Sequence, residues 1–231
     1  MKCKSEQYIV LRSIFKSYFL VFSLLLCGSG LTSAQSISKD VSQTEVIVKN
    51  TVAVSVAELL EKFNQERDFY ETEPDRFFKN MDVALSKIVD FRRIAARVMG
   101  KYARKASKEQ KNNFVDVFKK SLYVTYTKTL IDSGVYKINV TKAKLNNRSN
   151  KRATVDLEVV SENGTIFPVI YSMHKTKENK WLLENVIVFG VNVGLAFRDR
   201  FEAQVRKNKG DISSVIKTWT VDLDIKKAEG A

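Results

Sequence analysis

The hydrophobic periodicity of this 231-residue chain changes once, near Gly134. Upstream of Gly134, apolar residues recur at spacings of three and four, which is the period of an amphipathic helix. Downstream, apolar and polar residues alternate over Tyr136–Val140, Val155–Val159 and Phe167–Met173, and a nearly continuous apolar run follows over Trp181–Val191. Alternation is typical of a strand with one covered face. Helices, then strands, then helices predict an α+β domain with a mainly antiparallel sheet of about four to five strands.

The stretch from Asp90 to Leu130 predicts two amphipathic helices joined by a capped turn. Ser107 and Gln110 form a capping box, in which each side chain bonds the backbone amide of the other residue. Large apolar residues line one face of each helix: Ile94, Ala95, Val98, Met99 and Tyr102 on the first, and Phe114, Val117, Phe118, Leu122 and Tyr126 on the second.

Further helices are expected over Val52–Arg67, from Pro74 to about Ile88, and over Leu195–Lys207 and Ile212–Trp219. Asp211 is suited to cap the last of these helices. Pro168 interrupts an otherwise regular strand pattern. Because proline cannot donate to a sheet ladder, Pro168 predicts an edge strand or a bulge.

The first 34 residues have the features of a cleaved secretory signal. Four basic residues precede an apolar run over 19–27, and Thr32 and Ala34 supply the small residues that signal peptidase requires. The run is shorter than the roughly 20 residues that span a membrane, which argues against a retained anchor. We expect cleavage after Ala34 and one domain over 35–231, beginning with a frayed polar segment from Gln35 to about Gln43.

Cleavage at that point removes both cysteines, Cys3 and Cys27. The mature chain then has neither disulfides nor cysteine metal ligands. The signal also carries four basic residues and one acidic residue, so its removal lowers the formal net charge from +13 to +10. A charge of this sign suggests anionic partners: lipid head groups, acidic protein surfaces or nucleic acid.

Catalytic and metal chemistry have little support in the residues. His174 is the only histidine, and it lies beside Lys175 and Lys177 at a strand end, with no acid partner at a readable spacing. No Gly-x-Ser-x-Gly elbow is present, and one histidine without cysteine leaves almost no ligands for zinc, copper or haem. We expect a surface histidine, no enzymatic activity and no cofactor.

Basic residues are dense on the two central helices, largely opposite the apolar stripe. A solvated helix face accounts for most of them. Nucleic-acid binding is disfavoured because the aromatic residues follow the apolar periodicities instead of interleaving with the charges, and because the chain carries an export signal. The densest group lies at and before the capped turn, where an acidic partner could dock: Lys101, Arg104, Lys105 and Lys108.

Three segments carry a resemblance to a known family. They are Val89–Leu130, with its DF, GKY and Ser-before-EQ features, FPVIYSM over Phe167–Met173, and WLLENVIVFGVNVGLAFRDRF over Trp181–Phe201. The chain resembles the MlaC family of periplasmic phospholipid-binding proteins over about 52–219. It departs from the family pattern at Asn185, where Asp is usual, and at Asn192, where Ser is usual.

The resemblance implies a monomeric carrier that holds a diacyl phospholipid as cargo. Its partners would be an inner-membrane ABC transporter complex with an MCE-domain subunit and an outer-membrane lipoprotein–porin complex, and its role would be to maintain outer-membrane lipid asymmetry. The alternative is a periplasmic protein-binding module with the same elements and a solid core. Residue counts leave both open, since fourteen Phe, eight Tyr and two Trp fit a pocket or a core.

For the carrier, we expect helices and a curved sheet to enclose an apolar lipid pocket between the strands and the helices of Asp90–Leu130. The lining residues expected from the helices are Val98, Met99, Tyr102, Phe118, Leu122 and Tyr126. Those expected from the strands are Val155, Leu157, Val159, Val169, Tyr171, Met173, Trp181, Val186 and Val188.

Overall fold

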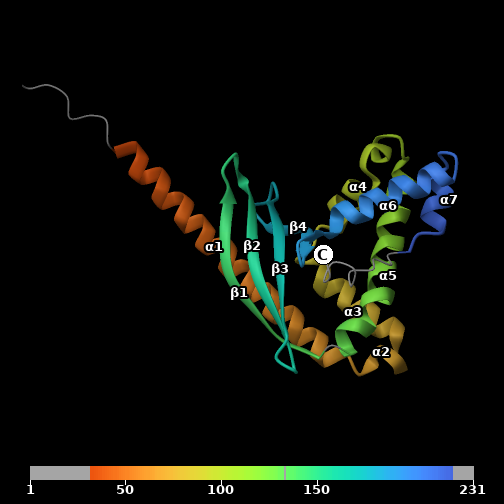
Figure 1. Cartoon of the computed structure of the whole chain (residues 1–231), viewed down its shortest axis with the longest axis horizontal. Coiled ribbons are helices and arrows are strands. Elements are labelled where there is room, and N and C mark those ends of the chain that lie inside the picture. Colours follow the sequence, from red (N-terminus) through yellow and green to blue (C-terminus); the bar gives the residue numbers. More distant parts are fainter. Residues whose placement is uncertain (1–31, 133, 221–231) are drawn as a thin grey trace, which may run out of the picture.

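The computed structural model describes residues 32–132 and 134–220 (Figure 1). Most of the expected signal segment therefore lies outside the described residues. The helices are α1 (Thr32–Glu66), α2 (Phe69–Thr72), α3 (Pro74–Ser86), α4 (Phe91–Met99), a 3₁₀ turn (Gly100–Arg104), α5 (Lys108–Asp132), α6 (Val193–Lys207) and α7 (Ile212–Lys217). The strands are β1 (Val135–Asn146), β2 (Ser149–Ser161), β3 (Ile166–Lys175), β4 (Trp181–Val188) and β5 (Val191–Asn192).

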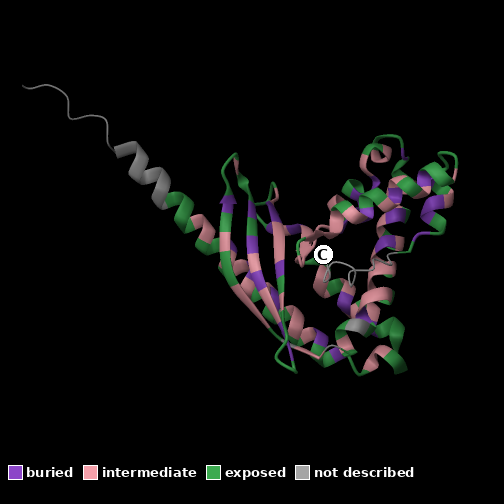
Figure 2. Ribbon diagram, viewed as in Figure 1, coloured by how far each residue is buried: buried purple, intermediate pink, exposed green. Residues whose placement is uncertain are grey.

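The strands form one curved antiparallel sheet in the order β1-β2-β3-β4-β5, so each strand pairs with the next in the chain. The predicted α+β class and the four to five antiparallel strands are confirmed. Buried and more accessible residues alternate along much of β2 (Figure 2). This alternation arises because successive side chains point to opposite faces of the sheet.

Helix α1 is much longer than the sequence predicted. It spans 35 residues and includes the segment from Gln35 to Gln43, which we expected to be frayed. Val48, Val52 and Val56 recur every fourth residue on the helix and are at most 2% exposed. They pack against apolar residues of the sheet, so tertiary contacts extend a helix whose local signal is weak. Within the described residues, none of the helices combines the length and the hydrophobicity that a membrane span requires.

The predicted helix caps are confirmed. The Gln110 amide donates to Ser107 Oγ over 3.0 Å, and the Ser107 amide donates to Gln110 Oε1 over 2.8 Å. Asp211 Oδ1 accepts from the Ser214 amide at the start of α7. These bonds satisfy amides that have no partner inside their own helix. They fix where α5 and α7 begin.

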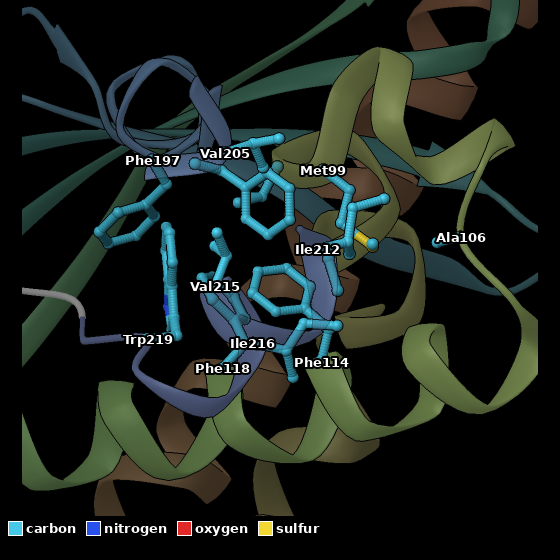
Figure 3. Packing of buried hydrophobic residues seen from close by; sticks show 13 residues of the cluster. Met99, Ala106, Phe114, Phe118, Phe197, Val205, Ile212, Val215, Ile216 and Trp219 are labelled. Atoms are coloured by element: carbon cyan, nitrogen blue, oxygen red, sulfur yellow. The ribbon is translucent and has the colours of Figure 1, made fainter. Parts of the chain in front are cut away.

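The helices α4 to α7 enclose a tightly packed core. Phe114, Phe118 and Phe201 are at most 1% exposed, and Phe118 lies 5.5 Å from Phe197 between ring centroids. Figure 3 shows these helices directing Phe118, Phe197 and Trp219 into one cluster. The rings meet edge-on or tilted, which is the favoured geometry for aromatic pairs.

Pro168 occupies an inner strand, so the expectation of an edge strand is wrong. It is the register partner of Glu158 on β2, whereas the pairing of β3 with β4 starts only at Val169. On the β4 side, the Pro168 carbonyl accepts a long 3.5 Å bond from the amide of Phe189. The proline is tolerated because it sits beyond the last regular β3–β4 pair.

Candidate functional site

An apolar patch lies on the part of the sheet that α1 does not cover. The contacts of α1 fall mainly on β1 and, less extensively, on β2. Farther along the same face, Val169 pairs with Val188 and Tyr171 pairs with Val186 across β3 and β4. Tyr171, Val186 and Val188 are only partly buried. The sheet therefore presents a contiguous apolar surface, which we call the β3–β4 patch, defined by these four residues.

Tyr171 gives the patch a polar atom that stays neutral. Burial raises the pKa of the Tyr171 hydroxyl above its ordinary value. The residue nevertheless keeps part of its surface accessible. It contributes an aromatic ring to this face.

The remaining strand residues of the expected pocket lie in the same cluster as the patch. Leu157 and Met173 are at most 2% exposed and pack in one cluster with the valines of α1. Other members of the expected set have the same surroundings: Val155 and Trp181 are buried, and Val159 is partly buried. The structure thus brings together all nine strand residues that the sequence grouped.

The helix residues do not face those strands as expected. Val98, Met99 and Phe118 are at most 1% exposed and belong to the core formed by α4 to α7. Three others of the expected set pack around that core and are partly buried: Tyr102, Leu122 and Tyr126. Sequence periodicity identified the buried stripe correctly but assigned it the wrong neighbour, because α6 and α7 cover it.

Of the basic residues in the expected docking cluster, one has an acidic partner. Lys101 Nζ donates to Glu202 Oε1 over 2.7 Å, and this bond raises the pKa of Lys101. Arg104, Lys105 and Lys108 are exposed, and within the described residues none of them forms a salt bridge. These three residues keep their charge available at the turn between α4 and α5.

His174 has an acid partner that the sequence spacing did not reveal. It is 7% exposed, and its Nε2 lies 2.9 Å from Asp90 Oδ2. Asp90 also caps α4, because its other oxygen accepts from the Arg93 amide. The expectation of a partnerless surface histidine is therefore wrong. The pair joins β3 to the start of α4 across 84 residues of chain, a separation that no local pattern reports.

A buried carboxylate connects α4 to β4. Glu184 is 5% exposed, Arg93 Nε lies 2.5 Å from one of its oxygens, and Arg97 Nη1 lies 3.1 Å from the other. Two guanidinium groups thus neutralise one buried acid. Together with the His174–Asp90 pair, this ion pair fixes the helical core against the sheet.

A further polar contact, centred on Asp82, joins α3 to α5. Asp82 Oδ1 accepts from Tyr123 OH over 2.8 Å and from Lys119 Nζ over 2.8 Å. Burial alone would raise the pKa of Asp82, but the hydrogen bonds from Lys119 and Tyr123 outweigh burial and lower it. The carboxylate therefore stays ionised at neutral pH. Burial, followed by the bond to Asp82, raises the pKa of Tyr123 well above its usual range.

Replacing His174 by alanine is expected to destabilise the fold without removing any lipid-contacting group. The substitution leaves a half-buried Asp90 oxygen without its partner, and loss of such a bond costs about 1–3 kcal/mol of unfolding free energy. Urea denaturation of His174→Ala measures this cost. Lys177→Ala, at an exposed position just beyond the same strand, serves as the control. Equal stability of the two variants would contradict a structural role for His174.

The structure contains recesses at its surface. One, of about 560 Å³, lies between α1 and β1 and is lined by both apolar and charged residues, among them Val56, Leu60, Ile138, Glu61 and Lys137. Within residues 32–132 and 134–220, no three His, Cys, Asp or Glu side chains are grouped as a metal site requires.

The model of the family described as MlaC protein matches residues 54–221. A relative, toluene tolerance protein ttg2D of Pseudomonas putida, is 33% identical over 175 residues, covering 75% of this chain and 80% of the relative. The chain belongs to the MlaC family. A phospholipid-binding protein from Ralstonia solanacearum, solved in complex with a phospholipid, has the same fold with a TM-score of 0.63. It is 22% identical, and the match covers 73% of this chain and 92% of that one.

The side chains of Asn185 and Asn192 bond to each other between β4 and the start of α6. Asn185 Nδ2 donates to Asn192 Oδ1 over 3.0 Å, and Asn185 Oδ1 accepts from the Gly194 amide. Asn192 Oδ1 also accepts from the Leu195 amide and caps α6. A Cβ on Gly194 would lie 2.3 Å from Asn185 Oδ1, so glycine is required for this close approach. Two neutral amides here make the hydrogen bonds that connect β4 to α6.

Proposed function

We propose that this MlaC-family chain is a periplasmic carrier that binds a diacyl phospholipid and moves it between outer-membrane and inner-membrane complexes. The observation that carries the proposal is the family match over 54–221, together with the shared fold of a protein solved with a phospholipid bound. The uncovered apolar surface of β3 and β4 is consistent with it. In this role the protein works as a monomer and helps to maintain outer-membrane lipid asymmetry.

A carrier of this kind needs an apolar surface and no covalent chemistry. Each buried CH₂ contributes about 0.8 kcal/mol, so two long acyl chains would lose on the order of 20 kcal/mol or more in water. The free energy of the lipid in the protein must match that of the lipid in the bilayer and not be lower. Otherwise release into the next membrane would be unfavourable. A few partly accessible apolar side chains meet this need.

We assign acyl-chain contact to the β3–β4 patch and to the other partly buried residues of the expected set: Val159, Tyr102, Leu122 and Tyr126. Val98, Met99 and Phe118 are not carried into this assignment, because their surfaces are already filled by α6 and α7. The contact surface therefore lies mostly on the sheet.

Native mass spectrometry of the protein purified from cells tests the proposal. We expect a mass increment equal to one or more diacyl phospholipids, confirmed by lipid extraction. A bare chain under gentle ionisation, which also takes up no phospholipid from vesicles, would contradict the proposal and favour a protein-binding module with a solid core.

The proposed partners are an inner-membrane ABC transporter complex with an MCE-domain subunit and an outer-membrane lipoprotein–porin complex. Arg104, Lys105 and Lys108 are suited to meet an acidic surface on either complex, since they are exposed and their charges are available. Attraction between exposed charges acts over roughly 10 Å at 0.1 M salt and mainly speeds encounter.

Reversing two of these charges is expected to slow lipid exchange and leave cargo unchanged. Arg104→Glu/Lys105→Glu should lower the exchange rate with a membrane-embedded partner complex about tenfold at low salt, with a smaller effect at high salt. Fluorescent phospholipid transfer measures the rate, and native mass spectrometry measures the bound lipid. The matched control is Lys207→Glu/Lys209→Glu, at and just after the end of α6. If Arg104→Glu/Lys105→Glu loses its lipid but exchanges at the normal rate, the docking surface and the cargo surface are assigned the wrong way round.

A further inference from the structure

A recess of about 530 Å³ lies on the sheet at the end where β1 turns into β2. In Figure 1 this end of the sheet is the upper one. Three cationic side chains line the recess: Lys144, Arg148 and Arg152. All three side chains are exposed, and within the described residues none of them forms a salt bridge. Like charges gathered at one recess repel each other, and an anion would relieve that repulsion.

The strand register places two hydroxyl groups beside Lys144 on the same face of the sheet. Lys144 on β1 pairs with Thr154 on β2, and Thr154 pairs with Ser172 on β3. The three residues therefore form one row across a single face of the sheet, with neighbouring strands about 4.8 Å apart. Arg152 lies two residues before Thr154 and so points to the same face. The row and Arg152 together provide an ammonium, a guanidinium and two hydroxyls, each of which is a hydrogen-bond donor for an anion.

The turn that carries Arg148 is fixed by local bonds. The Arg148 amide donates to Asn146 Oδ1 over 2.9 Å, and the Lys151 amide donates to Ser149 Oγ over 3.3 Å. Side-chain bonds of this kind stabilise a short turn between strands. The backbone at Arg148, one of the residues that line the recess, is thereby fixed.

The acids near the recess do not cancel its charge. Glu184 lines it but is already held by Arg93 and Arg97, so the three groups together carry a positive charge. Asp156 lies on the same face two residues beyond Thr154, where Lys142 is its register partner on β1. The recess therefore keeps a net positive charge.

We propose that this recess binds a phosphate group, as a phosphate monoester or diester. A tetrahedral phosphate offers several acceptor oxygens to the hydroxyl pair and to the flanking cations, and charge-assisted bonds of this type are the strong ones. Arg148 and Arg152 suit phosphate because a guanidinium presents paired donors. The site lies on the opposite sheet face from the β3–β4 patch, since Thr154 and Ser172 alternate with Val155 and Tyr171. It is thus distinct from the acyl-chain surface.

Isothermal titration with sn-glycerol 3-phosphate and with inorganic phosphate, together with flotation on phosphatidylglycerol vesicles, tests the site. Lys144→Gln/Arg152→Gln removes two of its charges. Lys142→Gln/Lys151→Gln removes the same charge from the same two strands outside the recess. We expect the first variant to weaken binding at least about tenfold, which is the effect of losing one charge-assisted bond. The second variant should change binding less than about twofold.

The two kinds of probe separate the possible sources of phosphate. Saturable binding of the soluble probes that is lost in Lys144→Gln/Arg152→Gln assigns the site to a free phosphate or phosphomonoester. Vesicle binding that is lost in the same variant, without binding of the soluble probes, assigns it to a lipid head group. Absence of both, or an equal loss in the Lys142→Gln/Lys151→Gln control, overturns the proposal. Thr154→Val supplies a second check, because it removes a hydroxyl donor at an exposed position without altering the net charge.

Discussion

Val186→Glu is expected to yield a folded protein that no longer carries phospholipid. Val186 is partly buried in the β3–β4 patch, where it pairs with Tyr171. A carboxylate there remains solvated in the empty protein but loses its water when an acyl chain covers it, and burying an unpaired charge costs several kcal/mol. We therefore expect lipid occupancy, measured by native mass spectrometry, to fall at least about tenfold.

The matched control is Ile187→Glu, which places the same charge on the next residue of β4. Ile187 is also partly buried but points to the opposite face, where Ile170 is its register partner. It should retain its lipid at the level of the unmodified chain. If both variants fold, by circular dichroism and urea denaturation, and both keep their lipid, the acyl chains do not contact the β3–β4 patch.

Local sequence signals predicted the elements and their ends. The Ser107–Gln110 box and the Asp211 cap are made by residues three positions apart, so their geometry can be read from the chain itself. The change of period near Gly134 likewise marks the start of the sheet, and Gly134 has the positive φ of 55° that suits a residue just after a helix. Features determined within one turn of chain are therefore predictable here.

Contacts between distant segments were not predictable in this way. Helix α1 begins well before Val52, where the local pattern predicts its start. Upstream of Val52, Val48 packs on the sheet, and Glu45 accepts a bond from the Leu145 amide 100 residues away. The partner of His174 lies 84 residues upstream. Periodicity states that a residue is buried but not against which element.

The same limit explains the candidate site. Alternation grouped the strand residues correctly, because residues on one face of a sheet remain neighbours whatever covers them. The apolar stripes of α4 and α5 had two possible partners, the sheet or the C-terminal helices. In the structure the C-terminal helices cover Val98, Met99 and Phe118. Only the residues left partly accessible after that packing remain available for a ligand.

Removal of both arginines that hold Glu184 is expected to be far more damaging than removal of the acid. In Arg93→Met/Arg97→Met, the carboxylate stays in a site that is 5% exposed and has lost both guanidinium partners. Removing one partner of a buried ion pair costs about 3–5 kcal/mol of unfolding free energy, because the charge that remains buried is uncompensated. Glu184→Gln should cost about 1 kcal/mol, since the amide oxygen still accepts from an arginine and the arginines reach solvent.

The decisive comparison is the triple variant. If the uncompensated carboxylate causes the loss, Glu184→Gln in the Arg93→Met/Arg97→Met background should restore stability, although the same substitution destabilises the unmodified chain. This reversal of sign is a coupling that simple loss of helix packing cannot produce. Arg104→Met, at an exposed position in the 3₁₀ turn that follows α4, controls for the exchange of arginine for methionine and should change stability by less than about 0.5 kcal/mol. A triple variant no more stable than the double would mean that the arginines stabilise α4 through their aliphatic contacts, and that Glu184 is held by other groups.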